Sequence, residues 1–192
     1  SFPSPYALRK KKNQEEKNEI GKLAATLVDN NDTMFITASS TCLSFANHLD
    51  TDYHLQVLTN GMPLAHVLSQ HENITVECPP GVYYYKHESI FGKDVADYIL
   101  KRHAKYCFMS CNGFDLDFGV SYYVDLDLPI VQACRKCCDQ MILLLDHTKI
   151  DQKYYYKALE FTDIDILITD RPLDERWMKA CKENNIKVLI PS

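Results

Sequence analysis

Three consecutive hydroxyl side chains, Ser39, Ser40 and Thr41, have the composition of an anion-binding site. They follow the apolar stretch "TMFITA" and precede a segment with helical spacing, so they stand at the start of an expected helix. One hydroxyl is enough to cap such a helix. The free amide groups and the positive dipole end of a helix start also attract anions. Two interpretations stay open on these residues alone: a plain helix cap, and a seat for a phosphate or carboxylate.

Three further groups of polar residues also follow apolar stretches. Each has an ordinary interpretation, because Asn-Gly and Asp-rich sequences form turns and a loop lysine is commonly exposed. Each also offers amide, carboxylate or ammonium groups that orient a small ligand. The candidate ligand-binding residues in these groups are Thr59 and Asn60 before Gly61, then Asn112, Gly113, Asp115 and Gly119 in "CNGFDLDFG" (111–119), and Lys149 in "DHTK" (146–149).

The apolar stretches are short and rich in strand-forming residues, and segments with helical spacing separate most of them. We expect strands over 33–38, 54–59, 73–78, 105–110, 141–146, 165–170 and 186–191. We expect helices over 15–29, 40–49, 61–70, 93–103, 128–139 and 174–184. This alternation predicts an α/β fold, with a mainly parallel sheet and helices on both of its faces.

Two segments, 79–89 and 112–127, follow strands without a clear helical pattern. Folds of the α/β class place their ligand-binding loops at such positions. The carboxyl ends of parallel strands meet at one edge of the sheet, so we expect the four polar groups to form one pocket. Hydroxyls, an amide, a carboxylate and a lysine suit a small polyol that carries a phosphate.

The composition narrows the class of protein. The chain has 192 residues, 46% of them hydrophobic, which predicts one globular domain with a substantial core. Its net charge of −5 disfavours a nucleic-acid surface on this chain. The only basic run is 9–12, which we interpret as part of a solvated tail. We expect a cytoplasmic protein without a membrane segment, because no apolar stretch approaches the roughly 18 residues of a span and the start lacks the pattern of a signal peptide.

Eight cysteines raise the question of disulfides or metal. Most of them are scattered singly through apolar segments, which favours reduced thiols in the core. Cys134, Cys137 and Cys138 have helical spacing and would share one helical face, but a second cysteine pair at metal-binding spacing is missing. We therefore expect packing at this helix, and neither a metal ion nor a cofactor.

The order of the motifs resembles the C-terminal effector domain of the DeoR family of bacterial transcriptional regulators, over essentially the whole chain. The matching phrases are "EKNEIGKLAA" (16–25), "TASSTC" (37–42), Thr59-Asn60, the segment 110–121 with Asn112, Gly113, Asp115 and Gly119 in register, "MILLLDHTKI" (141–150) and "TDIDILITD" (162–170). The resemblance also places Pro80-Gly81 where the family has two glycines after the third strand, and so adds Gly81 to the candidate ligand-binding residues.

The resemblance implies a fold similar to those of ribose-5-phosphate isomerase, glucosamine-6-phosphate deaminase and the CoA transferases. It implies that the domain binds a phosphorylated sugar or a similar small metabolite, with the phosphate held at Ser39, Ser40 and Thr41. It also implies DNA binding only through an N-terminal winged helix-turn-helix that is absent from these residues, and assembly as a homo-oligomer. We accordingly expect 1–14 to be an N-terminal linking tail and 15–192 to be the effector-binding domain.

The sequence departs from the family pattern at several positions, among them the last threonine of the hydroxyl loop, which is Cys42. The aspartate before the hydroxyl loop is Thr37, and the glycine of that loop is Ser39. A glutamate and a lysine expected before "MILLLD" align with Pro129 and Val131. A side chain in place of glycine predicts a narrower pocket or an additional hydroxyl contact, and the loss of two charged groups predicts a changed ligand specificity.

Three hypotheses for function follow. The first is a ligand sensor without catalysis. The second is a sugar-phosphate isomerase or deaminase of the same fold, which needs a carboxylate base, for which Asp115 and Asp117 are the acids of the candidate loop. The third is an oligomerisation domain with a vestigial pocket, favoured by the tyrosines of "GVYYYKHES" (81–89) and "QKYYYKAL" (152–159).

Overall fold

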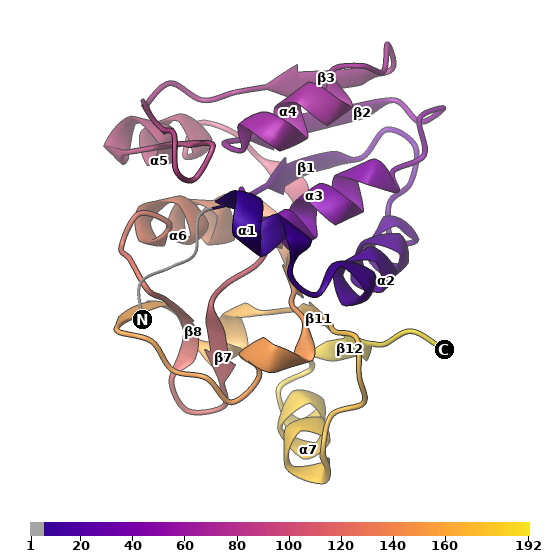
Figure 1. The fold of residues 1–192 in the computed structure, drawn as a ribbon, viewed down its shortest axis with the longest axis vertical. Coiled ribbons are helices and arrows are strands. Elements are labelled where there is room, and N and C mark those ends of the chain that lie inside the picture. Colours follow the sequence, from indigo (N-terminus) through magenta and orange to yellow (C-terminus); the bar gives the residue numbers. More distant parts are fainter. Residues whose placement is uncertain (1–5) are drawn as a thin grey trace.

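The computed structural model describes residues 6–192 and contains a seven-stranded parallel sheet. Its strand order is β12-β11-β9-β6-β1-β2-β3, and each neighbouring pair is parallel. The strands are β1 (Thr33–Ile36), β2 (Leu55–Thr59), β3 (Ile74–Glu77), β6 (Ala104–Met109), β9 (Cys138–Leu144), β11 (Ile166–Ile168) and β12 (Lys187–Leu189). Figure 1 shows the sheet extending from β3 at the top of the view to β12 beside the C-terminus. The predicted parallel sheet is confirmed, strand by strand.

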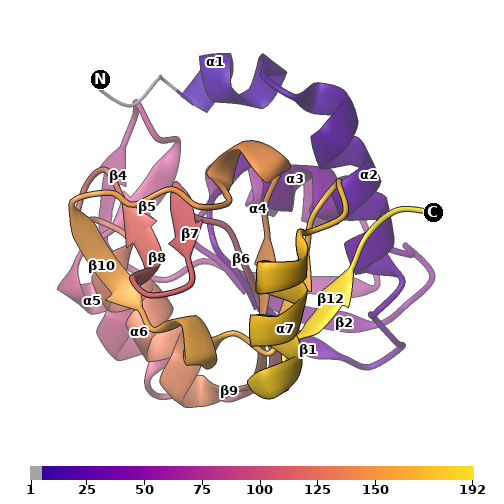
Figure 2. The ribbon, with the colours of Figure 1, turned by 90° about the horizontal axis from the view of Figure 1, so that it is seen from below.

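Helices cover both faces of this sheet, as the alternating pattern predicted. They are α1 (Tyr6–Lys11), α2 (Gln14–Ala25), α3 (Ser40–Asn47), α4 (Met62–Leu68), α5 (Lys93–Ile99), α6 (Leu128–Cys137) and α7 (Glu175–Glu183), with 3₁₀ turns η1 (His147–Lys149) and η2 (Phe161–Asp163). Figure 2 shows α5 and α6 together on one side and α1, α2 and α3 on the other. No helix in residues 6–192 has both the length and the apolar character needed to cross a membrane.

The sheet separates two hydrophobic cores because successive side chains of a strand point to opposite faces. In β1, Met34 and Ile36 join the core under α2, α3 and α4, whereas Phe35 joins the core under α5, α6 and α7. Strands buried on both faces explain why the sequence reads as continuous apolar runs. Cys138 opens β9 directly after α6, so the expectation that Cys134, Cys137 and Cys138 share a helical face is wrong for Cys138, although all three are buried.

The two segments without a helical pattern form small antiparallel sheets. The first, 79–89, contributes most of a hairpin of β4 (Val82–Tyr84) and β5 (Ser89–Phe91). The second, 112–127, contains β7 (Gly113–Asp115) and β8 (Gly119–Tyr122), and β8 also pairs with β10 (Tyr156–Leu159). Pairing within these segments satisfies backbone groups that a bare loop would leave to water.

The amino-terminal segment differs from the expected solvated tail. Residues 6–11 form α1, which contacts α3, and the Tyr6 side chain is buried. The Tyr6 amide donates to the carbonyl of Lys86 (3.2 Å) in the β4–β5 turn. Apolar contact and this hydrogen bond hold the segment against the domain, whereas a run of like charges alone predicts solvation. The solvated interpretation of 9–12 is therefore wrong for the half-buried Arg9, whereas Lys10, Lys11 and Lys12 are exposed. A linking role for 1–14 stays a prediction.

Close packing of α2 on α3 sets the position of α3. A Cβ atom on Gly21 would lie 2.6 Å from the backbone nitrogen of Phe45, well inside van der Waals contact. Glycine at this position therefore lets the two helices approach backbone to backbone.

We expect Gly21→Ala to lower the free energy of unfolding by about 1–3 kcal/mol, because the added methyl group forces the helices apart. Urea denaturation of the wild type and the variant measures the change. Lys22→Ala is the matched control in the next, exposed position of the same helix, and should stay within about 0.5 kcal/mol. Equal stabilities of Gly21→Ala and the wild type would contradict the close approach.

Candidate functional site

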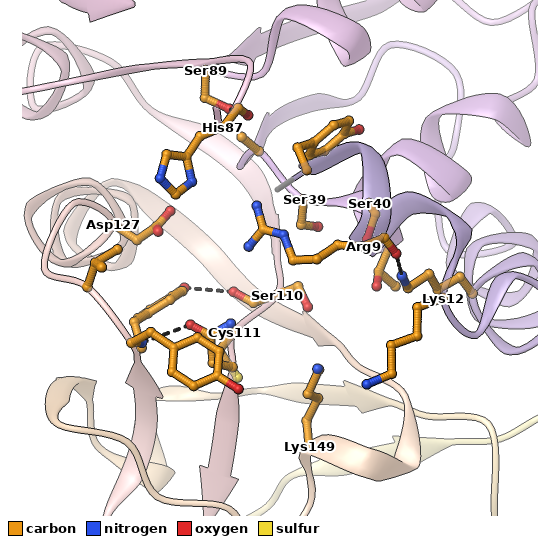
Figure 3. Close-up of a pocket in the computed structure, with 18 of the residues that line it drawn as sticks. Arg9, Lys12, Ser39, Ser40, His87, Ser89, Ser110, Cys111, Asp127 and Lys149 are labelled. Carbon is orange, nitrogen blue, oxygen red and sulfur yellow. Dashed lines mark hydrogen bonds between the residues drawn. The ribbon is translucent and has the colours of Figure 1, made fainter. Parts of the chain in front are cut away.

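The main pocket lies where the order of the strands reverses. From β1 the chain proceeds to β2 and β3 on one side, whereas β6, β9, β11 and β12 follow on the other side. The crossovers on either side of β1 and β6 therefore diverge, and such switch points form crevices at the carboxyl ends of the strands. Residues after β1, β6 and β9 line this pocket together with α1, α2, the β4–β5 turn and the segment before α6. Figure 3 shows side chains from these elements pointing into one space.

The hydroxyl cluster occupies the wall after β1, as the sequence predicted. Ser39 has extended backbone, and its side chain accepts a hydrogen bond from the Cys42 amide (2.9 Å). This cap satisfies one of the first amides of α3, whereas the amides of Ser40 and Thr41 have no partner within the helix. All three hydroxyl residues line the pocket. The cap and an anion seat are thus compatible here, because the same turn serves both.

Four basic side chains surround this helix start. Arg9 and Lys12 come from the amino-terminal segment, Lys17 comes from α2 and Lys149 from η1. In Figure 3 the Lys12 and Lys149 side chains extend toward each other, and the Arg9 guanidinium lies in front of Ser39. Four cations in one pocket of a chain with net charge −5 create a local positive potential that attracts an anion.

Lys17 is the buried member of this positive region. Its ammonium group donates to the carbonyl of Arg9, which fixes the end of α1 to α2. Burial lowers the pKa of Lys17 to about 8, the nearby Asp146 opposes that shift, and Lys149, Arg9 and Lys12 lower the pKa further. Neighbouring cations without enough counter-charge destabilise one another, and a bound anion would relieve this repulsion.

The opposite wall carries an acid and an imidazole. Asp127 precedes α6, and burial raises the pKa of its carboxyl from 3.8 to about 7, although Arg9 opposes the shift. His87 lies in the β4–β5 turn, edge-on to Phe91 with ring centroids 5.7 Å apart. Burial, followed by the charges of Arg9 and Lys86, lowers the pKa of His87. A neutral imidazole and a carboxylate can both accept hydrogen bonds from a ligand.

Two further polar groups face the same pocket. Asn112 follows β6, and its side-chain oxygen accepts the amide of Tyr123 (2.9 Å), which leaves its NH₂ group as a donor. Tyr6 is only 4% exposed, and its hydroxyl has no hydrogen-bond partner among residues 6–192. A buried hydroxyl without a partner is costly to the folded chain.

Five of the predicted residues come together in this pocket: Ser39, Ser40, Thr41, Asn112 and Lys149. Thr59 and Asn60 do not line it. The Asn60 side chain accepts the amide of Ala38 (2.9 Å) and donates to the carbonyl of Ile90 (2.9 Å). Asn60 therefore holds the strand that leads into Ser39 against the β4–β5 hairpin, which covers this part of the sheet edge.

The remaining four predicted residues also lie outside the pocket lining. Gly113, Asp115 and Gly119 belong to the β7–β8 hairpin, which carries them away from the edge of the main sheet, and Gly81 precedes β4. The Asp115 carboxylate accepts the amides of Asp117 (3.0 Å) and Phe118 (2.8 Å). Gly119 has φ +79° and closes the same turn. These residues shape the hairpin, and the sequence interpretation of a turn describes their arrangement here.

Sequence reasoning missed the other charged residues of the pocket, and the signals for them differed. Arg9 and Lys12 were visible only as a charge run. His87 and Asp127 lie within 79–89 and 112–127, the two segments expected to hold ligand contacts, but neither residue was selected. Of the family departures, Val131 is fully buried in the core and Ser39 supplies the cap of α3.

Comparison with solved structures identifies proteins that share this α/β fold. Ribose 5-phosphate isomerase A from Methanocaldococcus jannaschii has a TM-score of 0.51 at 12% identity, covering 72% of this chain and 55% of that one. The delta subunit of eIF2B from Chaetomium thermophilum has a TM-score of 0.60 at 14% identity, covering 84% of this chain and 57% of that one. The chain thus spans little more than half of each structure, and shares with both a mainly parallel α/β domain.

Sequence relatives define the family. The family model described as the DeoR C terminal sensor domain matches residues 12–171. The HTH-type transcriptional regulator GolR of Listeria innocua is 33% identical over 179 residues, which is 93% of this chain and 70% of that protein. The HTH-type transcriptional repressor GlcR of Bacillus subtilis is 30% identical, over 96% of this chain and 71% of that protein. The chain belongs to the DeoR family of transcriptional regulators and is its C-terminal sensor domain.

The raised pKa of Asp127 predicts a pH-dependent stability. Between pH 4 and pH 7 the folded chain holds a proton on this carboxyl that the unfolded chain has released, so folding becomes less favourable as the pH rises through that range. Asp127→Asn removes this cost. We expect the variant to exceed the wild type in free energy of unfolding by about 1–3 kcal/mol at pH 8, and by less at pH 5.

Urea denaturation at both pH values measures this difference. The exposed Asp125, two residues earlier, provides a matched acid-to-amide control, Asp125→Asn. A stability gain of Asp127→Asn that is the same at pH 5 and pH 8, or that Asp125→Asn reproduces, would contradict the buried carboxylate.

Proposed function

We propose that this domain senses a phosphorylated sugar or a related anionic metabolite and thereby controls DNA binding by a winged helix-turn-helix on its amino-terminal side. The observation that carries the proposal is the convergence of four basic side chains on the start of α3. Membership of a sensor family supports the sensing role. Regulation of DNA of this kind is exercised in the cytoplasm, and the proposal includes this location.

The phosphate would lie at the start of α3. The amides of Ser40 and Thr41 and the hydroxyl groups donate to its oxygens, while Lys149 and Lys12 neutralise its charge. Hydroxyl groups of the sugar would then face the Asn112 amide. Each of these contacts is stronger in a pocket that excludes water than on an open surface.

The signal would reach the DNA-binding part through the amino-terminal segment. Arg9 and Lys12 belong to that segment, so an anion in the pocket interacts with the chain that precedes the domain core. The ligand can shift the arrangement of this segment only by the difference in its affinity for the two arrangements.

We expect a metabolite panel to identify ligands by thermal stabilisation. A ligand at 100 times its dissociation constant adds about 2.7 kcal/mol of stability, which is a clear rise in melting temperature. Ser40→Ala combined with Lys149→Ala should abolish the rise, because the double variant loses a hydroxyl donor and a cation at the same anion. Lys179→Ala, in the exposed part of α7, is the control and should respond like the wild type.

The outcomes of the panel separate the hypotheses. An unchanged response of the double variant would contradict this anion site. No response of the wild type to any of a broad set of pentose, hexose and triose phosphates would favour a vestigial pocket instead.

Catalysis by an isomerase of this fold is disfavoured by the position of its expected base. Asp115 and Asp117 were the acids of the candidate loop, and neither lines the pocket. The Asp115 carboxylate accepts two amides of a tight turn. We expect no isomerisation of ribose 5-phosphate or glucose 6-phosphate above the buffer rate in a coupled assay. Turnover that disappears in Asp127→Asn, which alters the one half-buried acid of the pocket without a structural partner, would establish an enzyme.

Assembly as a homo-oligomer is a further part of the proposal, supported by an aromatic surface on the β4–β5 hairpin. Tyr83 is 52% exposed and Tyr85 is 76% exposed. Aromatic residues of this kind are enriched at protein interfaces. We expect light scattering to give a mass above that of one chain, and Tyr83→Ser with Tyr85→Ser to reduce it. A monomeric wild type at micromolar concentration would contradict this assignment.

A further inference from the structure

The pocket has two ends of different chemistry. At one end, the start of α3 faces Lys12 and Lys149, and at the other end Asp127 and His87 lie together (Figure 3). The Arg9 guanidinium lies between these ends in the same view. A ligand that fills the space therefore meets cations with one part and a carboxylate with another.

The Asp127 carboxylate has no visible structural role in the described chain. Asp127 precedes α6 at the position of a helix cap, yet its backbone is in the helical region and its side chain caps no amide. Within residues 6–192 it accepts no hydrogen bond and forms no ion pair, although Arg9 lies close enough to affect its charge. A partly buried carboxylate without a donor is costly to the unliganded chain.

Asp146, the other acid of the pocket, differs from Asp127 because its side chain has hydrogen-bond partners. Asp146 is 2% exposed, and its side chain accepts the amide of Thr148 (3.0 Å) and the hydroxyl of the same residue, so it caps η1. The Asp146 carboxylate therefore has a structural role in the described chain, through its Oδ1 atom. Of the two acids that line the pocket, Asp127 is the one whose carboxylate has no hydrogen-bond partner in the described chain.

The structure assigns Asp127 as a specificity-determining residue that accepts a hydrogen bond from the end of the metabolite remote from its phosphate. This inference rests on the proposed function and names the class of ligand: a phosphorylated sugar with a hydroxyl or ammonium donor at that end. A metabolite with a second anion there, such as a phosphorylated sugar acid or a bisphosphate, is repelled by Asp127. The raised pKa of Asp127 fits a carboxylate that gains from a donor in the complex.

Isothermal titration of the 192-residue chain with a graded panel tests the assignment. The panel holds inorganic phosphate, ribose 5-phosphate, glucose 6-phosphate, glucosamine 6-phosphate, 6-phosphogluconate and fructose 1,6-bisphosphate. Glucose 6-phosphate and 6-phosphogluconate form the central pair, because they differ mainly in a carboxylate at the far end. Comparing glucosamine 6-phosphate with glucose 6-phosphate distinguishes an ammonium donor from a hydroxyl donor.

We expect the wild type to bind at least one neutral-ended or amino sugar phosphate at least tenfold more tightly than 6-phosphogluconate. Asp127→Asn should weaken the binding of that sugar phosphate about tenfold or more, because a hydrogen bond to a charged acceptor is lost. The variant should also narrow the discrimination against 6-phosphogluconate, and keep its affinity for inorganic phosphate within about twofold, since phosphate occupies the cationic end. Asp127→Ala should act in the same direction, and Asp125→Asn should behave like the wild type.

The two proposals fail in different ways. If the wild type binds 6-phosphogluconate or the bisphosphate most tightly, or if Asp127→Asn leaves the ratio of affinities unchanged, the specificity assignment is wrong and the sensor proposal stands. If no phosphorylated compound binds the wild type, the sensor proposal itself fails. If Asp127 had only a structural role, its substitution would lower the affinities for all compounds, including inorganic phosphate, by one common factor.

Discussion

The polar pocket depends on the divergence of the chain around β1 and β6. These two strands are neighbours in the sheet, yet the strands that follow each of them lie on opposite sides. No connection can cover the space above both strand ends, so the polar residues after β1 and β6 remain facing it. The start of α3 is directed into this space because Gly21 lets α2 hold α3 at backbone distance. Burial of apolar residues on both faces of the sheet thus determines where a charged ligand can be received.

The charged lining of the pocket opposes the stability of the fold. Arg9, Lys17 and Lys149 are brought together without a matching set of acids, and the partly buried Asp127 has no hydrogen-bond donor among residues 6–192. Residues that cost stability and have no structural partner are characteristic of binding sites, where the complementary group arrives with the ligand. The orphaned Tyr6 hydroxyl belongs to the same pattern. The pocket therefore has the charge pattern expected of a site for an anionic ligand, in agreement with the proposed function.

The main sheet could be predicted from the sequence because its strands are apolar runs separated by helical spacing, and this signal is local. The pairing of β8 with β10 could not, since it joins segments more than thirty residues apart. The hydroxyl cluster, Asn112 and Lys149 were predictable because they directly follow strands. Asp115 was misplaced because a hairpin that leaves the sheet edge has the same polar composition as a binding loop. Arg9 required knowledge that Tyr6 is buried, and a charge run in the sequence carries no such information.

The hydrogen bond between the Tyr6 amide and the Lys86 carbonyl gives α1 a mechanical role. This bond anchors the beginning of α1 on the hairpin that carries His87, while Lys17 anchors its end on α2 through the Arg9 carbonyl. Because α1 is held at both ends, it cannot tilt without moving either the β4–β5 hairpin or α2. If the proposed metabolite resists a tilt of α1, then a tilt imposed from outside the domain lowers the affinity for that metabolite by the same factor, by thermodynamic reciprocity.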